Sequence, residues 1–323
     1  MRFSISTNWN SREREDGDAM LDEIASLGFD RAELGYALTH GQAEAVRRRV
    51  RAGALRVSSV HAFCPFPLPG IRPDPEPFSI CDPKDFKGRR RGIEAALETA
   101  RFAAEMGAPA MVLHAGRAPV FRAARRLQRL VEDGLRRTPK YERALLKFQM
   151  KRERKAAKGL DTLRASLDIL LPEFERLGVK LCLENLPTAD AIPNEPEMFA
   201  LLREYEGAPL AYWHDWGHGQ LRHELGLVHQ GMLLKRLAGR VGGMHLHDVL
   251  PPLEDHNMPP GGLVDFRPLA PFVASDIPLV FEPRRGLPAA DIARALAHFR
   301  ELFPPPPPAA APGAAPAAPE GAP

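Results

Sequence analysis

The chain has 323 residues, of which 44% are hydrophobic and 26% are charged, and its formal net charge is +3 at pH 7. This balance is that of an ordinary globular protein and indicates no charged partner for the chain as a whole. Its three cysteines, Cys64, Cys81 and Cys182, are too few for a disulfide framework. Because no leader-like N-terminus and no run of about 18 apolar residues occurs, we expect a cytoplasmic protein without a membrane span.

Short apolar segments alternate with longer amphipathic segments along the chain, which predicts repeated βα units and a parallel sheet. The expected strands cover residues 2–6, 31–34, 55–61, 110–114, 180–184, 210–215, 242–247 and 278–282. Helices are expected between them, most clearly over residues 19–27, 89–106 and 161–177. Each of these three is followed by a glycine, a residue typical of helix ends.

The loop after the first expected strand distinguishes between two α/β architectures. An open doubly wound sheet that binds nucleotides carries a glycine-rich loop there, whereas this chain has the sequence STNWN over residues 6–10. Alpha/beta barrels often use about 250 residues or more as a single unit. We therefore predict a single (β/α)₈ TIM barrel over residues 1–303.

Two segments lie outside this repeat. Residues 118–158 are too long for one crossover and are rich in Arg and Lys, which predicts a basic helical insertion after strand four, either a hairpin or a lid. Residues 304–323 consist mainly of Pro, Ala and Gly, which predicts a disordered tail. The insertion is the one part of the chain with enough positive charge to bind a polyanion.

Ionisable side chains occupy or closely follow the last positions of most predicted strands. They are His61, His114, Glu184, Asp215, His218, His245, His247 and Glu282. In a barrel these positions meet at one mouth, where catalytic residues are found. Carboxylates at the ends of apolar strands are costly unless a cation compensates them. Imidazole and carboxylate donors without thiolates indicate a divalent metal such as Zn²⁺, Mn²⁺, Co²⁺ or Fe²⁺.

Several short motifs resemble the xylose isomerase-like barrel superfamily, which includes sugar isomerases and epimerases, inosose dehydratase and endonuclease IV. The motifs are MVLH at 111–114, LEN at 183–185, DWGH at 215–218, MHLHD at 244–248 and PGGLVDF at 260–266. Together they span most of residues 1–303. The resemblance implies a carbohydrate-active metalloenzyme, with Mn²⁺, Zn²⁺, Co²⁺ or Mg²⁺ as cofactor and with the capacity to form homo-oligomers.

The resemblance also implies roles for individual residues. The core metal ligands would be Glu184, Asp215, His245 and Glu282. A second set would bind either substrate or additional metal: His61, His114, His218, Glu254, His256 and Arg284. Endonuclease IV has an Asp-x-His pair where this chain has Glu254-Asp255-His256, so its third metal is in question here.

For the reaction, the resemblance favours a sugar or sugar phosphate isomerase or epimerase that transfers a proton through a metal-stabilised enediol. Glu184 and Glu282 would then be the catalytic acid and base. An endonuclease IV-like zinc phosphodiesterase acting on abasic DNA is the alternative, because the histidine complement matches it. The insertion lacks the interleaved aromatic side chains of a nucleic-acid platform, and Arg284-Arg285 is more similar to the isomerases. A non-catalytic barrel scaffold is a third reading.

Overall fold

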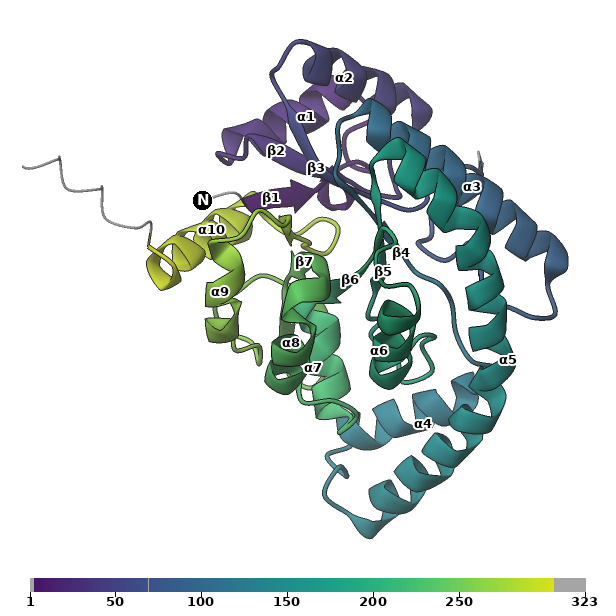
Figure 1. The fold of residues 1–323 in the computed structure, drawn as a ribbon. Coiled ribbons are helices and arrows are strands. Elements are labelled where there is room, and N and C mark those ends of the chain that lie inside the picture. Colours follow the sequence, from purple (N-terminus) through teal and green to yellow (C-terminus); the bar gives the residue numbers. More distant parts are fainter. Residues whose placement is uncertain (1–2, 69, 305–323) are drawn as a thin grey trace, which may run out of the picture.

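Eight parallel strands form a closed barrel in the computed structural model, which describes residues 3–68 and 70–304 (Figure 1). Their order around the barrel is β1, β10, β7, β6, β5, β4, β3 and β2. The predicted (β/α)₈ barrel is confirmed, and each predicted strand is present. The bounds are β1 Phe3–Ser6, β2 Arg31–Leu34, β3 Arg56–His61, β4 Ala110–Leu113, β5 Lys180–Glu184, β6 Leu210–Asp215, β7 Val241–Leu246 and β10 Leu279–Phe281.

Helices surround the barrel and connect successive strands (Figure 1). They are α1 Gly17–Ser26, α2 His40–Arg51, α3 Phe86–Glu105, α4 Phe121–Glu132, α5 Pro139–Leu177, α6 Glu195–Glu204, α7 Trp216–Glu224, α8 Gln230–Leu237, α9 Ala270–Val273 and α10 Ala289–Leu302. Their ends follow local chemistry: the Thr138 side chain caps the first turn of α5, and Gly178 ends the helix at a φ of 69°.

The barrel interior is filled by a small apolar cluster separate from the larger core between strands and helices. Trp213 is its largest member and is fully buried, with its ring centroid 5.0 Å from that of His245. A Cβ atom at Gly243 would lie 2.0 Å from the Trp213 ring, so only glycine at this position of β7 admits the indole. Trp213 therefore forms an apolar floor beneath the barrel mouth.

The segment inserted after β4 is helical, as expected, but its second helix does not end where the insertion was predicted to end. Helix α5 runs through residues 139–177 without interruption and so joins the insertion to the helix expected over residues 161–177. Helix α4 packs against its first half. The pair is also fastened to the end of α7, because Tyr141 Oη donates to the Leu225 carbonyl at 2.7 Å.

Three arginines hold the loop between β5 and α6. Arg117, from the loop after β4, donates to the Thr188 hydroxyl, and Arg222 of α7 donates to the Thr188 carbonyl at 2.7 Å. Arg152, from the insertion half of α5, donates to the Ala191 carbonyl and forms two 2.8 Å bonds with Glu197. The loop beside the barrel mouth is thereby tied to the insertion.

A two-stranded antiparallel hairpin, which was not predicted, follows β7. It consists of β8 Asp248–Leu250 and β9 Glu254–Asn257. The Asp248 carboxylate accepts bonds from the backbone N–H groups of Gly262 and Val264, so the loop after the hairpin folds back onto its start. Most of the predicted tail, residues 305–323, lies outside the described residues. Within the described part of the chain, no helix is long and apolar enough to cross a bilayer.

A candidate metal centre at the barrel mouth

Four side chains converge where neighbouring strands end. Glu184 ends β5, Asp215 ends β6, His245 lies near the end of β7, and Glu282 directly follows β10. Each offers a ligand atom, and these atoms lie within 4.8 Å of one another. All four residues are at most 6% exposed. The structure thus brings together the four residues predicted as core metal ligands.

Parallel pairing places these groups side by side. Asp215 lies opposite His245 between β6 and β7, and His245 lies opposite Val280 between β7 and β10. Asn185 reinforces the join between β5 and β6, because its amide accepts from the Asp215 N–H at 2.7 Å and donates to the Asp215 carbonyl at 2.9 Å. The positions of the ligand atoms therefore follow from backbone register.

The buried charges at this site stabilise one another. Burial raises the pKa of Glu184, but His245 and His114 outweigh burial and hold that pKa well below its usual range. Burial lowers the pKa of His245, while Glu282, Glu33 and Glu184 raise it well above its usual value. Several buried carboxylates thus require positive charge from their surroundings, which a divalent cation supplies more compactly than protonated imidazoles.

The donor set fits such a cation. Three carboxylates and one imidazole, without thiolates, suit Zn²⁺, Mn²⁺ or Co²⁺. The His245 ring is oriented for this role, because its Nε2 faces Glu33 at 3.1 Å while its Nδ1 faces Glu184 and Glu282, each also at 3.1 Å. Donation from Nε2 to Glu33 leaves Nδ1 free to act as a ligand. The fully buried Glu33 also accepts from the Ser59 hydroxyl at 2.8 Å.

A second group of potential ligands consists of His61, His114 and Glu184, and it has Glu184 in common with the first group. His61 Nδ1 faces the Ala62 carbonyl at 2.9 Å, so this nitrogen donates and Nε2 is directed at Glu184, 3.3 Å away. His114 Nε2 lies 3.0 Å from the same carboxylate. Burial lowers the pKa of His114, but Glu184 and Glu76 raise it to about 10. This carboxylate is therefore surrounded by groups that can hold a second cation.

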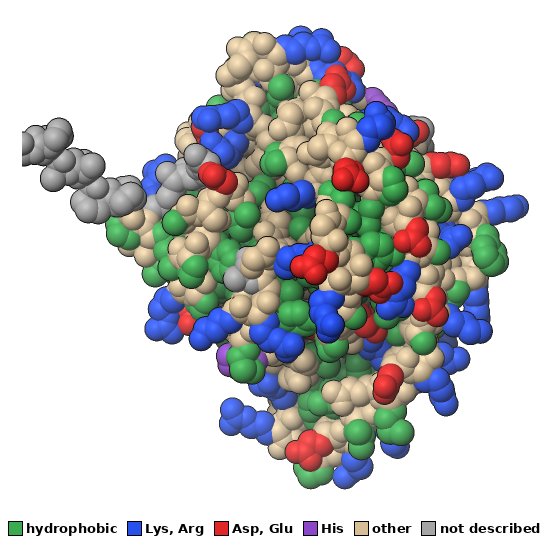
Figure 2. All heavy atoms as spheres, in the orientation of Figure 1, with side chains coloured by type: hydrophobic (Ala, Val, Ile, Leu, Met, Phe, Trp, Pro, Cys, Tyr) green, Lys and Arg blue, Asp and Glu red, His purple; other side chains and the backbone are tan. Residues whose placement is uncertain are grey.

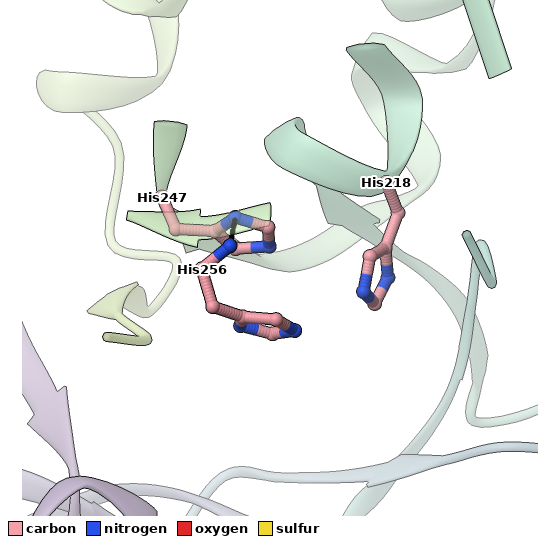
Figure 3. Close-up of side chains that lie close together, drawn as sticks. All are labelled: His218, His247 and His256. Carbon is pink, nitrogen blue, oxygen red and sulfur yellow. Dashed lines mark hydrogen bonds between the residues drawn. The ribbon is translucent and has the colours of Figure 1, made fainter. Parts of the chain in front are cut away.

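The third group consists of His218, His247 and His256 (Figure 3). His218 projects from α7 and faces the other two rings, which stack with centroids 4.0 Å apart. His218 Nδ1 faces the Asn185 carbonyl at 2.9 Å, and His256 Nδ1 faces the Glu282 carbonyl at 3.1 Å. If these Nδ1 atoms donate, the Nε2 atoms of His218 and His256 remain available to a ligand.

His247 differs from its two neighbours because both of its ring nitrogens are engaged. The His256 backbone N–H donates to His247 Nδ1 at 2.9 Å, as the dashed line in Figure 3 marks. His247 Nε2 therefore carries the hydrogen and donates to Asp215, 2.9 Å from Oδ1. Such an arrangement fixes the orientation of Asp215, so His247 is a positioning residue rather than a free ligand.

A cavity of about 490 Å³ opens beside these groups and is lined by Glu282, His256, Tyr36 and several arginines. Tyr36 lies next to His61, with ring centroids 5.5 Å apart, and burial and Glu282 raise its pKa to about 12. Its hydroxyl therefore remains a hydrogen-bond donor. Arg284, predicted to bind substrate, lines this cavity. Glu254 is exposed on β9 and belongs to none of the three groups found among the described residues.

Three residues at this site had no assigned role from sequence. Glu33 is the penultimate residue of β2, as His245 is of β7, so its signal was present in the sequence but was not used. Glu76 belongs to the long loop after β3, which has no periodic pattern, and forms bonds of 2.7 Å with Arg117 and 3.2 Å with His114. His247 was noted at a strand end, but its engagement with Asp215 depends on the unpredicted hairpin.

The barrel, with its acidic and imidazole groups at the carboxyl ends of the strands, defines a class of proteins with active sites at that face. The family model described as xylose isomerase-like TIM barrel matches residues 21–302. The chain belongs to this family, as the motifs indicated. Among curated protein sequences, none matches the chain significantly.

Solved structures of similar fold include several sugar epimerases. A D-tagatose 3-epimerase-like protein is 16% identical, with a TM-score of 0.65 over 94% of this chain and 97% of that protein. The 3-keto-D-glucoside 4-epimerase YcjR from E. coli is 19% identical, with a TM-score of 0.64 over 93% and 99%. D-Psicose 3-epimerase from Clostridium cellulolyticum H10 is 12% identical, with a TM-score of 0.65 over 94% and 99%. At these identities the likeness establishes the fold.

Proposed function

We propose that this protein is a divalent-metal-dependent isomerase or epimerase that acts on a sugar or sugar phosphate. The observation that carries the proposal is the convergence of Glu184, Asp215, His245 and Glu282 in one buried group beside an open cavity. Membership of the xylose isomerase-like family and the sugar epimerases among the structural neighbours support the same class of reaction.

These four residues would hold the cation, which when bound polarises substrate oxygens and stabilises the negative charge that develops on them. Glu282 lines the cavity and so can reach a substrate directly. Glu184 also faces His245 Nδ1, and both carboxylates are 3.1 Å from that nitrogen. Two carboxylates at one site can remove and return a proton on the carbon next to a carbonyl.

Other side chains would bind the sugar hydroxyls. The ring nitrogens of His218 and His256 that do not face carbonyl groups can donate or accept hydrogen bonds, and the Tyr36 hydroxyl can donate one. Trp213, beneath His245, excludes water from the floor of the site. A substrate held between these groups would be positioned with its reacting carbons over the carboxylates.

The test is proton exchange, because it does not require the product to be known. Purified protein loaded with Mn²⁺, Co²⁺ or Zn²⁺ is incubated in D₂O with a panel of ketoses, aldoses and their phosphates, and incorporation of deuterium at the carbon next to the carbonyl is followed by NMR. We expect exchange with at least one sugar and its loss in Glu282→Gln. The exposed Glu254→Gln variant is the matched control and should retain exchange.

Absence of exchange with every sugar, in protein that carries about one equivalent of metal, would contradict the proposal. Protein that binds no metal from any of the three ions would instead support the scaffold interpretation. A cytoplasmic location and a homo-oligomeric state stay predictions, and size-exclusion chromatography with light scattering tests the second.

A second candidate, a metal-dependent phosphodiesterase acting on nucleic acid, is favoured by one specific observation. Two further groups of potential ligands flank the first, and one of them shares Glu184. The surface offers less support, because the Lys and Arg side chains over α3, α4 and α5 are interspersed with acidic ones in Figure 2. About three equivalents of tightly bound metal, with nicking of an abasic-site duplex that is lost in Glu184→Ala, would favour this candidate.

A further inference from the structure

The cavity beside Glu282 is lined by an unusual number of guanidinium groups. Four arginines line it, namely Arg12, Arg72, Arg284 and Arg285, whereas its acidic lining residues are Asp74 and Glu282. Glu282 belongs to the candidate metal centre, so a bound cation would offset its charge. The remainder of the cavity therefore carries a clear excess of positive charge.

Three of these arginines lack an acidic partner. Arg285 is paired with Glu13. Among the described residues, by contrast, no carboxylate lies within ion-pair distance of Arg12, Arg72 or Arg284. Most arginines that form side-chain hydrogen bonds elsewhere in the fold are paired with acids. Guanidinium groups gathered in one cavity without carboxylates at ion-pair distance repel one another, and an anionic ligand relieves that repulsion.

Backbone contacts hold the Arg12 guanidinium and the chain segments that carry Arg72 and Arg284. Arg12 Nη2 donates to the Pro73 carbonyl at 2.6 Å, and Pro73 and Pro75 restrict the conformation of the segment that carries Arg72. The Arg284 N–H donates to the His256 carbonyl at 2.7 Å, which places this arginine directly beside the mouth. The site is thus built from three separate segments of the chain.

We propose that this arginine cluster, Arg12, Arg72 and Arg284, binds the phosphoryl group of the substrate while its reacting carbons lie at Glu282. A phosphoryl dianion has three oxygens and about two negative charges. Three guanidinium groups therefore match it better than they match a carboxylate, which has two oxygens and one charge. The volume of about 490 Å³ accommodates a sugar phosphate. This inference rests on the proposed function and narrows its substrate class to phosphorylated sugars.

Equilibrium binding of inorganic phosphate tests the site without any need for turnover. Phosphate is titrated by calorimetry into metal-loaded and chelator-stripped protein, at constant ionic strength with chloride as the competing anion. We expect binding in both forms and a decrease of about 100-fold in Arg72→Gln/Arg284→Gln, about tenfold for each guanidinium. Arg300→Gln is the control, because Arg300 is exposed near the end of α10 and does not line the cavity.

The outcomes separate the inference from the function on which it rests. Phosphate that binds equally well to wild type and the double variant, or that binds only when metal is present, would overturn the arginine cluster as its site. Phosphate binding that depends on the cluster, in protein that exchanges no sugar protons, would retain the site and reject the isomerase proposal. Unchanged thermal unfolding of the double variant shows that it is folded.

Two sources of the phosphoryl group are distinguished in the same way. Glycerol phosphate presents a monoester dianion, whereas a short single-stranded oligodeoxynucleotide presents diesters. The proposal expects the monoester to bind more tightly, with the difference abolished in the double variant. Tighter binding of the oligonucleotide through the same arginines would reject a sugar phosphate and favour the phosphodiesterase. Once a substrate is known, loss of the cluster should raise KM for the phosphorylated sugar and leave KM for the free sugar nearly unchanged.

Discussion

Gly217 lies so close to His247 that one added methyl group must displace the ring. A Cβ atom at Gly217 would be 1.9 Å from His247 Cε1 and 2.2 Å from Nδ1, whereas ordinary contact begins at 3.4 Å. The ring would therefore have to move by more than about 1 Å, which breaks hydrogen bonds that now measure 2.9 Å to Asp215 and to the His256 N–H. Gly217→Ala should consequently release Asp215 from its fixed orientation.

The expected size of the effect follows from the role of His247. Groups that orient metal ligands typically contribute 10- to 100-fold in metal affinity, which corresponds to about 1.4–2.7 kcal/mol. We expect Gly217→Ala and His247→Leu to weaken metal binding by this amount. His247→Gln should weaken it less, because its amide can still donate to Asp215. Competition with a chromophoric chelator measures the affinity.

Helix propensity alone predicts that Gly217→Ala stabilises the fold and does not change metal binding. Alanine is favoured over glycine inside a helix by about 1 kcal/mol, and Gly217 lies in α7. Gly41→Ala in α2 is the control, because its nearest neighbour would be 3.9 Å away, so it should gain stability and leave metal affinity unchanged. If Gly217→Ala behaves like Gly41→Ala, His247 does not position Asp215 and the reasoning is wrong.

Two further predictions concern charge. In the folded protein the pKa of His114 is raised to about 10 and that of His218 to about 9. Their protonated rings therefore stabilise the fold fully at pH values below the unfolded pKa near 6.5. The metal-free protein should therefore lose stability as pH rises from about 6.5 to 10. Metal binding at pH 7.5 should release protons, which calorimetry in two buffers of different ionisation enthalpy would detect. Arg222→Met should cost about 3–5 kcal/mol in urea unfolding by leaving Glu195 buried without its partner, and adding Glu195→Leu should recover most of that loss.

The core of the candidate site could be predicted from sequence because each ligand has a strong local signal. Glu184 and Glu282 end apolar runs, and a barrel brings strand ends together whatever the details of its loops. Glu33 is penultimate in its strand, as His245 is, but it follows a single alanine rather than an apolar run, so its signal is weaker. Glu76 lies in an irregular loop whose path depends on contacts made after folding.

The length of α5 illustrates why a local signal can mislead. The insertion was expected to end at residue 158 and the next helix to begin at residue 161, which placed a break between them. In the structure the helix continues, and a Cβ atom at Gly159 would lie 2.7 Å from Ile192. The glycine therefore permits close packing of the helix on the loop after β5. A single sequence does not distinguish a glycine that ends a helix from one that allows such an approach.

The bonds from Arg152 to Glu197 and to the Ala191 carbonyl have an evolutionary consequence. They join the insertion half of α5 to the start of α6 and to the loop between β5 and α6. A shorter relative without the helical insertion would leave the acid at position 197 with its bond from the Asn194 N–H but without a cationic partner, so the insertion should favour an acid there. Comparison of homologues would detect this as covariation between the presence of the helical insertion and an acid at position 197. Deleting the helical insertion in the laboratory should likewise be better tolerated with glutamine there, which can keep the bond from the Asn194 N–H.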